Sequence, residues 1–305
     1  MPSFLQHAQR LLGRLGSIED RLDRVQRAVA RVELHLQDLR GLTDPVDREM
    51  QAYSQWGEDG ILQALVRRVP LGRKRFVEFG VEDYRESNTR FLLQHDNWSG
   101  LVMDGSASNV ERIVSDAISW RQDLSARCAF ITRENIDGLL TEAGYDGDLD
   151  LLSIDVDGND YWIWEAVTVA APRIVVVEYN SAFGPKATCS IPYRADFQRT
   201  SAHSSNLYFG ASVAAFEHLA TKRGYRLVCG NRAGNNLFFV REDLAGDLPR
   251  RRAADVWVAS RFREMRDERG ALLYTRAEEG RRAIEGQRVV DVVTGESHAL
   301  GEILE

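Results

Sequence analysis

The first forty residues carry apolar side chains at alternating intervals of four and three residues, with charged residues at most positions between them. The apolar positions are Leu11, Leu15, Ile18, Leu22, Val25, Val29, Val32, Leu36 and Leu39. Two apolar residues in every seven are typical of a coiled coil, and this stripe is narrower than the face that a helix usually buries on its own domain. We therefore predict a coiled-coil helix over residues 11–39, and not the alternative of a single amphipathic helix packed on its own domain.

The residue types along this stripe bear on the number of chains. With Leu15 at heptad position a, leucine dominates the a positions, and β-branched residues occupy most of the d positions. This combination disfavours a simple parallel dimer and favours larger assemblies. We expect a homo-oligomer formed through residues 11–39, with a tetramer preferred to a dimer.

After residue 45, short apolar runs typical of buried strands alternate with segments of helical periodicity. Strands are expected at 75–80, 100–105, 128–132, 150–156 and 173–180, followed by a hairpin at 225–229 and 237–240. Helices are expected at 90–95, 109–117, 136–143 and 211–223. This alternation predicts an α/β fold: a Rossmann-like, doubly wound, mostly parallel sheet with an antiparallel C-terminal hairpin, preceded by the coiled-coil helix.

The same pattern divides the chain into three regions. Residues 1–44 form the oligomerisation helix, 45–245 the α/β domain, and 246–305 an accessory segment that serves as a lid or a subunit contact. This last region contains an arginine run at 250–252 and a predicted hairpin at 289–300. The arginine run is either a solvated face or a patch that attracts an anionic acceptor.

Acidic residues stand at the ends of four of the predicted strands. They are Glu78, Asp104, Asp155 and Glu178. Because parallel strands end at the same edge of a sheet, where open α/β sheets bind ligands, we expect these carboxylates to lie near one another. Two further acids, Asp157 and Asp160, closely follow Asp155, and the alternative for them is a solvated turn with helix-capping side chains.

The spacing between Gly80 and Asp104 is about that of nucleotide-type cofactor sites. An acidic residue some twenty positions after a glycine-bearing first strand–helix turn binds ribose hydroxyls in such sites. No Gly-x-Gly-x-x-Gly motif is present, which disfavours an NAD-dependent oxidoreductase. The surrounding acids would also repel a dinucleotide.

Four segments give the chain a family resemblance. They are Tyr53–Asp59, Phe76–Gly80, Gly100–Asp104 and Ile154–Asp160. In these segments the chain resembles the class I S-adenosylmethionine-dependent methyltransferases, and among them the FkbM-like family. The resemblance covers roughly residues 50 to 240. One departure is Glu82, which occupies the position of the second glycine in that family's cofactor loop.

The resemblance implies a set of cofactor-binding residues. Glu78 and Gly80 would form the cofactor loop, Asp104 would hold the ribose, residues 132–135 would lie beside the adenine, and Asp155 would lie near the methionine end. The full set of cofactor candidates is Glu78, Gly80, Asn88, Asp104, Gly105, Thr132 and Asp155.

Methyl transfer to a hydroxyl requires a group that takes the hydroxyl proton. The candidate catalytic residues are Asp155, Asp157 and His203, although a solvated loop histidine is the alternative for His203. Asp155, Asp157, Asp160 and Glu178 could instead hold one Mg²⁺ through oxygen ligands. The alternative is that Asp157 and Asp160 only cap the next helix.

Composition narrows the class of partner. The net charge of −7 disfavours a general nucleic-acid surface, and no apolar run is long enough to span a membrane. The three cysteines are scattered without a Cys-x-x-Cys motif, which is typical of a reducing compartment, so we expect a cytoplasmic protein.

Together these patterns predict an S-adenosylmethionine-dependent O-methyltransferase that acts on a small polar molecule, a sugar or a glycan intermediate, with Mg²⁺ assistance as a variant. The alternative from another class is a catalytically silent oligomeric scaffold with a methyltransferase-like fold.

Overall fold

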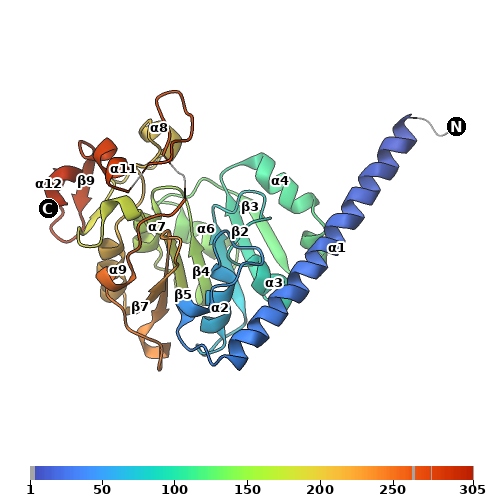
Figure 1. The fold of residues 1–305 in the computed structure, drawn as a ribbon. Helices are drawn as coiled ribbons and strands as arrows, with labels where there is room; N and C mark the ends of the chain where they lie inside the picture. The colour runs from blue at the N-terminus through green and yellow to red at the C-terminus, as the bar shows by residue number, and fades with distance from the viewer. Residues whose placement is uncertain (1–3, 263–264, 276, 305) are drawn as a thin grey trace.

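The computed structural model describes residues 4–262, 265–275 and 277–304, and it shows a central sheet between two layers of helices (Figure 1). The sheet contains β1 (Arg75–Phe79), β2 (Ser99–Asp104), β3 (Leu124–Cys128), β4 (Gly147–Ile154), β5 (Ala170–Glu178), β7 (Tyr225–Gly230) and β8 (Asn236–Arg241). Its order is β3-β2-β1-β4-β5-β8-β7, with the first five strands parallel and β8 antiparallel to both neighbours. The predicted Rossmann-like sheet with its antiparallel hairpin is confirmed.

Helices cover both faces of the sheet. One face carries α2 (Glu58–Val66), α3 (Arg90–Asp96), α4 (Ala107–Ser115) and α5 (Ile118–Arg121). The other carries α6 (Ile136–Glu142), α7 (Asp160–Ala166), α9 (Val213–Lys222) and α10 (Ala253–Val256). Successive strand residues point to opposite faces, so Phe76 joins one core while Val77 and Phe79 join the other.

The third strand lies earlier in the chain than the prediction of 128–132. β3 ends at Cys128 and forms one edge of the sheet, where its side chains are half-buried or exposed. An edge strand needs no continuous apolar run, so its sequence does not resemble a buried strand. The apolar residues Phe130 and Ile131 follow the strand as a loop at the carboxyl edge.

A small second sheet packs beside the main one. It consists of β6 (Cys189–Ser190), β9 (Arg288–Asp291) and β10 (Ser297–Ala299), and the predicted C-terminal hairpin is confirmed as β9–β10. The adjoining helices are α8 (Arg199–Ala202), α11 (Ala277–Ile284) and α12 (Leu300–Ile303). Single 3-10 turns lie at Pro45–Arg48, Ser181–Phe183 and Glu242–Leu244. Phe183, Phe209 and Val289 belong to their shared core, which joins the C-terminal region to the α/β domain.

The N-terminal helix α1 (Phe4–Leu39) runs along one side of the domain, and its N-terminal part projects beyond it (Figure 1). Ala30 and Leu34 are buried against Tyr53 and Phe91 of the domain. No helix among the described residues is long and apolar enough to cross a membrane.

The segment Tyr53–Asp59 is held by two buried carboxylates at the start of α2. Asp59 Oδ2 accepts hydrogen bonds from the backbone amides of Ala52, Tyr53 and Ser54, at 2.7–2.8 Å, and from the Ser54 hydroxyl. Glu58 accepts from the side-chain amides of Asn231 and Asn236 in the β7–β8 hairpin. Asp59 therefore holds the loop before α2, and Glu58 connects this region to the distant β7–β8 hairpin.

Burial raises the pKa of Asp59 to about 6, above its unfolded value near 4. Between pH 4 and pH 6 the Asp59 carboxyl is therefore protonated in the native state but ionised in the unfolded chain. The stability that this carboxyl contributes at low pH is lost as the pH rises through about 6. We expect the free energy of unfolding to fall by about 3 kcal/mol from this group between pH 4 and 7. In Asp59→Asn, whose amide oxygen keeps the acceptor position, this slope should disappear in urea titrations.

A matched variant separates charge from hydrogen bonding. At pH 4, where the wild-type carboxyl is protonated, Asp59→Ala removes the shared acceptor of four donors and should lower the free energy of unfolding by about 3 kcal/mol, whereas Asp59→Asn should change it by less than about 1 kcal/mol. Equal losses in the two variants would contradict this account of Asp59.

Candidate functional site

The candidate site lies where the strand order reverses, between β1 and β4. The chain moves outward from β1 to β3 and returns to β4, so the loops after β1 and β4 diverge and leave a crevice at the carboxyl edge. Two adjoining cavities occupy this edge, of about 460 and 170 Å³. They share the lining residues Gly80, Glu82, Asp155 and Asp157.

Gly80 is required by the close approach of the loops after β1 and β4. Its φ is +69°, and a Cβ at this position would lie 1.5 Å from the backbone oxygen of Asp155. Any side chain would therefore push the two loops apart. Gly80 lines both cavities, as the resemblance implied, and it also fixes the distance between their two walls.

Asp104, at the end of β2, lines the smaller cavity and is mostly occupied by protein donors. Its Oδ2 accepts from the Glu82 amide at 2.9 Å, and its Oδ1 accepts from the Ser106 amide and the Asn109 side chain. A carboxylate offers about four acceptor sites, so about one remains for a ligand hydroxyl. The role of Asp104 at a ribose therefore stays a prediction.

The remaining wall of the smaller cavity is apolar. Gly105, Phe130 and Ile131 line it, and Phe130 is 49% exposed at its mouth. Thr132, predicted to lie beside an adenine, is not among the described lining residues. The backbone amide of Thr132 instead donates a hydrogen bond to the side-chain oxygen of Asn135. Because β3 already ends at Cys128, the preceding residues Phe130 and Ile131 line the cavity in its place.

Glu78 has a structural role that the sequence did not show. Its carboxylate accepts hydrogen bonds from the backbone amides of Asn88 and Thr89 and from the hydroxyls of Ser87 and Thr89. It thereby anchors the chain entering α3, and burial raises its pKa. Asn88 donates to the hydroxyl of Ser153 and lines the larger cavity, not the smaller one.

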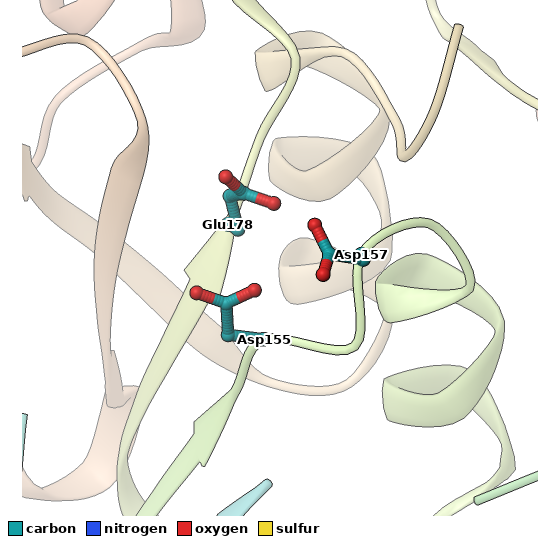
Figure 2. A group of neighbouring side chains, drawn as sticks. All are labelled: Asp155, Asp157 and Glu178. Carbon is teal, nitrogen blue, oxygen red and sulfur yellow. The ribbon is translucent and has the colours of Figure 1, made fainter. Parts of the chain in front are cut away.

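Three carboxylates converge where the cavities meet. Asp155 follows β4, Asp157 lies on the same loop, and Glu178 ends β5. Figure 2 shows the three side chains pointing toward one another. One oxygen of each lies within 4.8 Å of the others. Burial, reinforced by the neighbouring carboxylates, raises the pKa of Asp155 and of Glu178 well above ordinary values.

Arg199, on α8, supplies positive charge to these carboxylates. Its guanidinium lies 3.0 Å from Asp157 and 3.9 Å from Glu178, and it stacks on the ring of Phe209. Sequence reasoning missed Arg199, because nothing in the local pattern around residue 199 indicates that α8 folds back over the strand ends. Glu178 Oε2 is buried and accepts no hydrogen bond from any residue that the structure describes.

Asp160 does not join the cluster, which corrects its assignment as a metal ligand. It is fully buried in the first turn of α7, and its two oxygens accept from the backbone amides of Val156 and Gly158, each at 2.9 Å. It therefore holds the loop that carries Asp157, in agreement with the capping alternative.

His203 also lies outside the described lining of the two cavities. Its Nδ1 lies 2.8 Å from the hydroxyl of Ser205, within its own loop, and it is not among the described residues that line either cavity. The structure therefore does not support His203 as a base, and the loop-histidine alternative describes it better.

The larger cavity is mostly polar. Beyond the shared residues and Asn88, its lining includes Gln55, Glu86, Glu178, Arg199, Asn206, Asn236, Phe262, Arg266 and Leu272. The last three come from the C-terminal region, and Phe262 stacks on Trp56 with ring centroids 4.8 Å apart. Residues of the C-terminal region thus contribute to the lining of the larger cavity, and a role of residues 246–305 as a lid stays a prediction.

The arginine run at 250–252 has local partners. Arg250 pairs with Glu242, Arg251 with Asp44 and Arg252 with Asp255. None of the three is among the described lining residues of the two cavities, so the cationic side of the larger cavity comes from Arg199 and Arg266.

Glu82 adopts a left-handed backbone conformation, with φ of +48°. This conformation costs a non-glycine residue about 1–3 kcal/mol. Glu82 is exposed to solvent where the two cavities meet, and its amide is held by Asp104. A glycine would fit this backbone better, so the presence of the Glu82 side chain here has a cost in stability.

We expect Glu82→Gly to raise the free energy of unfolding by about 1 kcal/mol, since the relief of strain exceeds the extra freedom that glycine has in the unfolded chain. Lys74→Gly is the matched control, because exposed Lys74 also has a left-handed φ of 56° and precedes β1, at the opposite edge of the sheet. Urea titrations should show similar gains for both variants, and an unchanged or lower stability in Glu82→Gly would disprove the strain.

Comparisons with known proteins place this geometry in context. No protein-family model matches the chain, and no curated protein does. The FkbM-like assignment therefore stays a prediction.

Several solved structures are similar to the chain at 11–12% identity. An S-adenosylmethionine-dependent methyltransferase from Clostridium acetobutylicum has a TM-score of 0.40, and the match covers 60% of this chain and 89% of that one. An O-methyltransferase from Bacillus cereus in complex with SAH has a TM-score of 0.39, with 70% and 90% covered.

The N-terminal domain of EvdMO1, determined in the presence of SAH and D-fucose, also has a TM-score of 0.39, with 60% of this chain and 80% of that one covered. Similarities at this level are weak, and a function has to be argued from the site's own residues.

Proposed function

We propose that the protein is an S-adenosylmethionine-dependent O-methyltransferase whose acceptor is a small polar molecule of the sugar type. The observation that carries the proposal is the pair of adjoining cavities that meet at Asp155. The smaller cavity suits the methyl donor and the larger one suits the acceptor. The seven-stranded Rossmann-like sheet and the resemblance of the sequence support the same assignment.

The smaller cavity has the chemistry of an adenosine site. Phe130 and Ile131 offer an apolar wall for a base, and Asp104 retains acceptor capacity for one hydroxyl. Toward the larger cavity the wall becomes acidic, through Glu82 and Asp155, which suits a cationic sulfonium and an α-ammonium group. When bound, this cofactor would supply an electrophilic methyl group.

The larger cavity can hold a hydroxylated acceptor. Amide side chains of Gln55, Asn88 and Asn236 line it, and the Trp56–Phe262 stack gives it an aromatic border. Amides bind hydroxyls as donors and as acceptors, and an aromatic face suits the apolar side of a sugar ring.

Asp155 is the proposed proton acceptor. It lines both cavities and is partly exposed, so that an acceptor hydroxyl could reach it. Its raised pKa makes it a stronger base than an ordinary aspartate, which a hydroxyl acceptor requires. Asp157 and Arg199 flank this position and would orient the acceptor.

The first test is calorimetric titration of the intact protein with S-adenosylmethionine and with S-adenosylhomocysteine. We expect dissociation constants in the micromolar range. Phe130→Ala should weaken binding about tenfold, because the loss of aromatic stacking on a base costs about 1–3 kcal/mol. Phe130 is half-exposed, so this variant should still fold.

Two further variants identify the binding face. Glu82→Gln should weaken the binding of S-adenosylmethionine by about three- to fivefold more than the binding of S-adenosylhomocysteine. The reason is that one exposed carboxylate is lost near the sulfonium, which S-adenosylhomocysteine lacks. Lys74→Gly should bind as the wild type does. Absence of binding by the folded wild type, with and without Mg²⁺, would overturn the enzyme assignment in favour of the scaffold.

A metal-assisted variant of the reaction is favoured by one specific observation. Glu178 Oε2 is buried without a described hydrogen-bond partner, and it belongs to the cluster with Asp155 and Asp157. These hard carboxylate oxygens fit Mg²⁺, which usually keeps several water ligands in addition to one or two carboxylates. A bound cation would lower the pKa of an acceptor hydroxyl.

Thermal unfolding with and without Mg²⁺ tests this variant. At a concentration about tenfold above the dissociation constant, Mg²⁺ should raise the Tm by about 2–4 °C. Glu178→Gln should abolish the increase, while Glu86→Gln, which changes an exposed acid of the same cavity, should keep it. Equal increases in both variants, or none in the wild type, would exclude the cluster as a Mg²⁺ site.

A further inference from the structure

The most conspicuous apolar surface of the molecule is a line of side chains along α1. It consists of Ile18, Leu22, Val25, Val29, Val32, Leu36 and Leu39, which we call the heptad seam. Each of these side chains is between 43% and 71% exposed. Soluble monomers rarely leave so long a contiguous apolar stripe in water, so a surface of this kind marks an interface.

The domain leaves the seam uncovered because it binds a different face of the helix. Among the α1 residues whose burial the structure describes, the buried ones are Ala30, Leu34 and Gln37. They take heptad positions b and f in the register that places Leu22 at position a. Tyr53 of the domain also hydrogen-bonds Asp23, another b residue. Since b and f point away from the a/d seam of a coiled coil, the domain would lie outside any such assembly.

These contacts also fix the direction in which the seam faces. The ion pair between Arg121 and Asp20 and the hydrogen bond of Gln37 with the Arg48 carbonyl attach α1 at two distant points of the domain. The helix is therefore held between residues 20 and 37, and the seam spans about 33 Å, or three heptads, on the free side.

We propose that the seam binds the same seam of further copies of this chain in a coiled coil. A second copy is the occupant that the surface itself specifies, because a strict a/d repeat is complementary to another helix of the same repeat. One charge pair beside the seam suits a parallel arrangement, in which Arg14 at position g of one helix would face Glu19 at position e of the next.

The assembly would surround the coil with active domains. It keeps the strand ends and both cavities of each domain open, because none of the seam residues lines them. This inference is independent of the proposed methyl transfer, since it rests on α1 alone.

Sedimentation of the full-length protein at about 10 µM provides the test. We expect the particle to contain two or more chains of 34.5 kDa. Leucine at a and β-branched residues at d favour the tetramer. Val25→Glu with Val29→Glu places charges on the seam and should give a particle of 34.5 kDa. The substituted side chains are exposed in the single chain, so the domain should keep its urea midpoint.

The matched control is Arg24→Glu with Arg31→Glu, which adds the same residues at exposed c positions of the same helix. This variant should keep the wild-type mass. A wild type that sediments at 34.5 kDa, or a seam variant that remains assembled, would overturn the proposal. Cofactor binding should be the same in both double variants, so failure of the assembly and failure of the enzyme assignment give different results.

Discussion

The contact between Gly80 and the backbone of Asp155 is the constraint on which the site depends. The loops after β1 and β4 come so close that no side chain fits at position 80. This approach brings the end of β4 beside the end of β1, and it makes Asp155 a wall of both cavities. A single missing Cβ therefore determines how closely the two cavities can meet.

The second constraint is electrostatic. Three carboxylates lie together in surroundings where ionisation is costly, and the protein offsets this only in part, through the Arg199 guanidinium. The consequence is a raised pKa for Asp155 and Glu178 and a buried oxygen of Glu178 that is unsatisfied within the described structure. A bound cation or a hydrogen-bond donor would relieve this arrangement.

Several acids that the sequence made candidates for chemistry turn out to fasten loops. Glu78 anchors the approach to α3, Asp160 holds the turn before α7, and Asp104 holds the Glu82 amide. A carboxylate that accepts several backbone amides replaces the hydrogen bonds that an irregular loop otherwise lacks. These three acids therefore hold the loops that carry the remaining carboxylates of the site.

The sequence by itself determined the fold class, the strand-end position of the site and the heptad repeat, because these depend on periodicities that hydrophobic burial imposes locally. Only the tertiary structure decided that Arg199 returns to the cluster, that Asp160 and His203 stay outside it, and that the domain packs on a different face of α1 from its seam. These outcomes depend on contacts between segments far apart in the chain, for which short-range patterns carry no signal. The early end of β3 has the same cause, since an edge strand is specified by its single neighbour and not by its own apolar content.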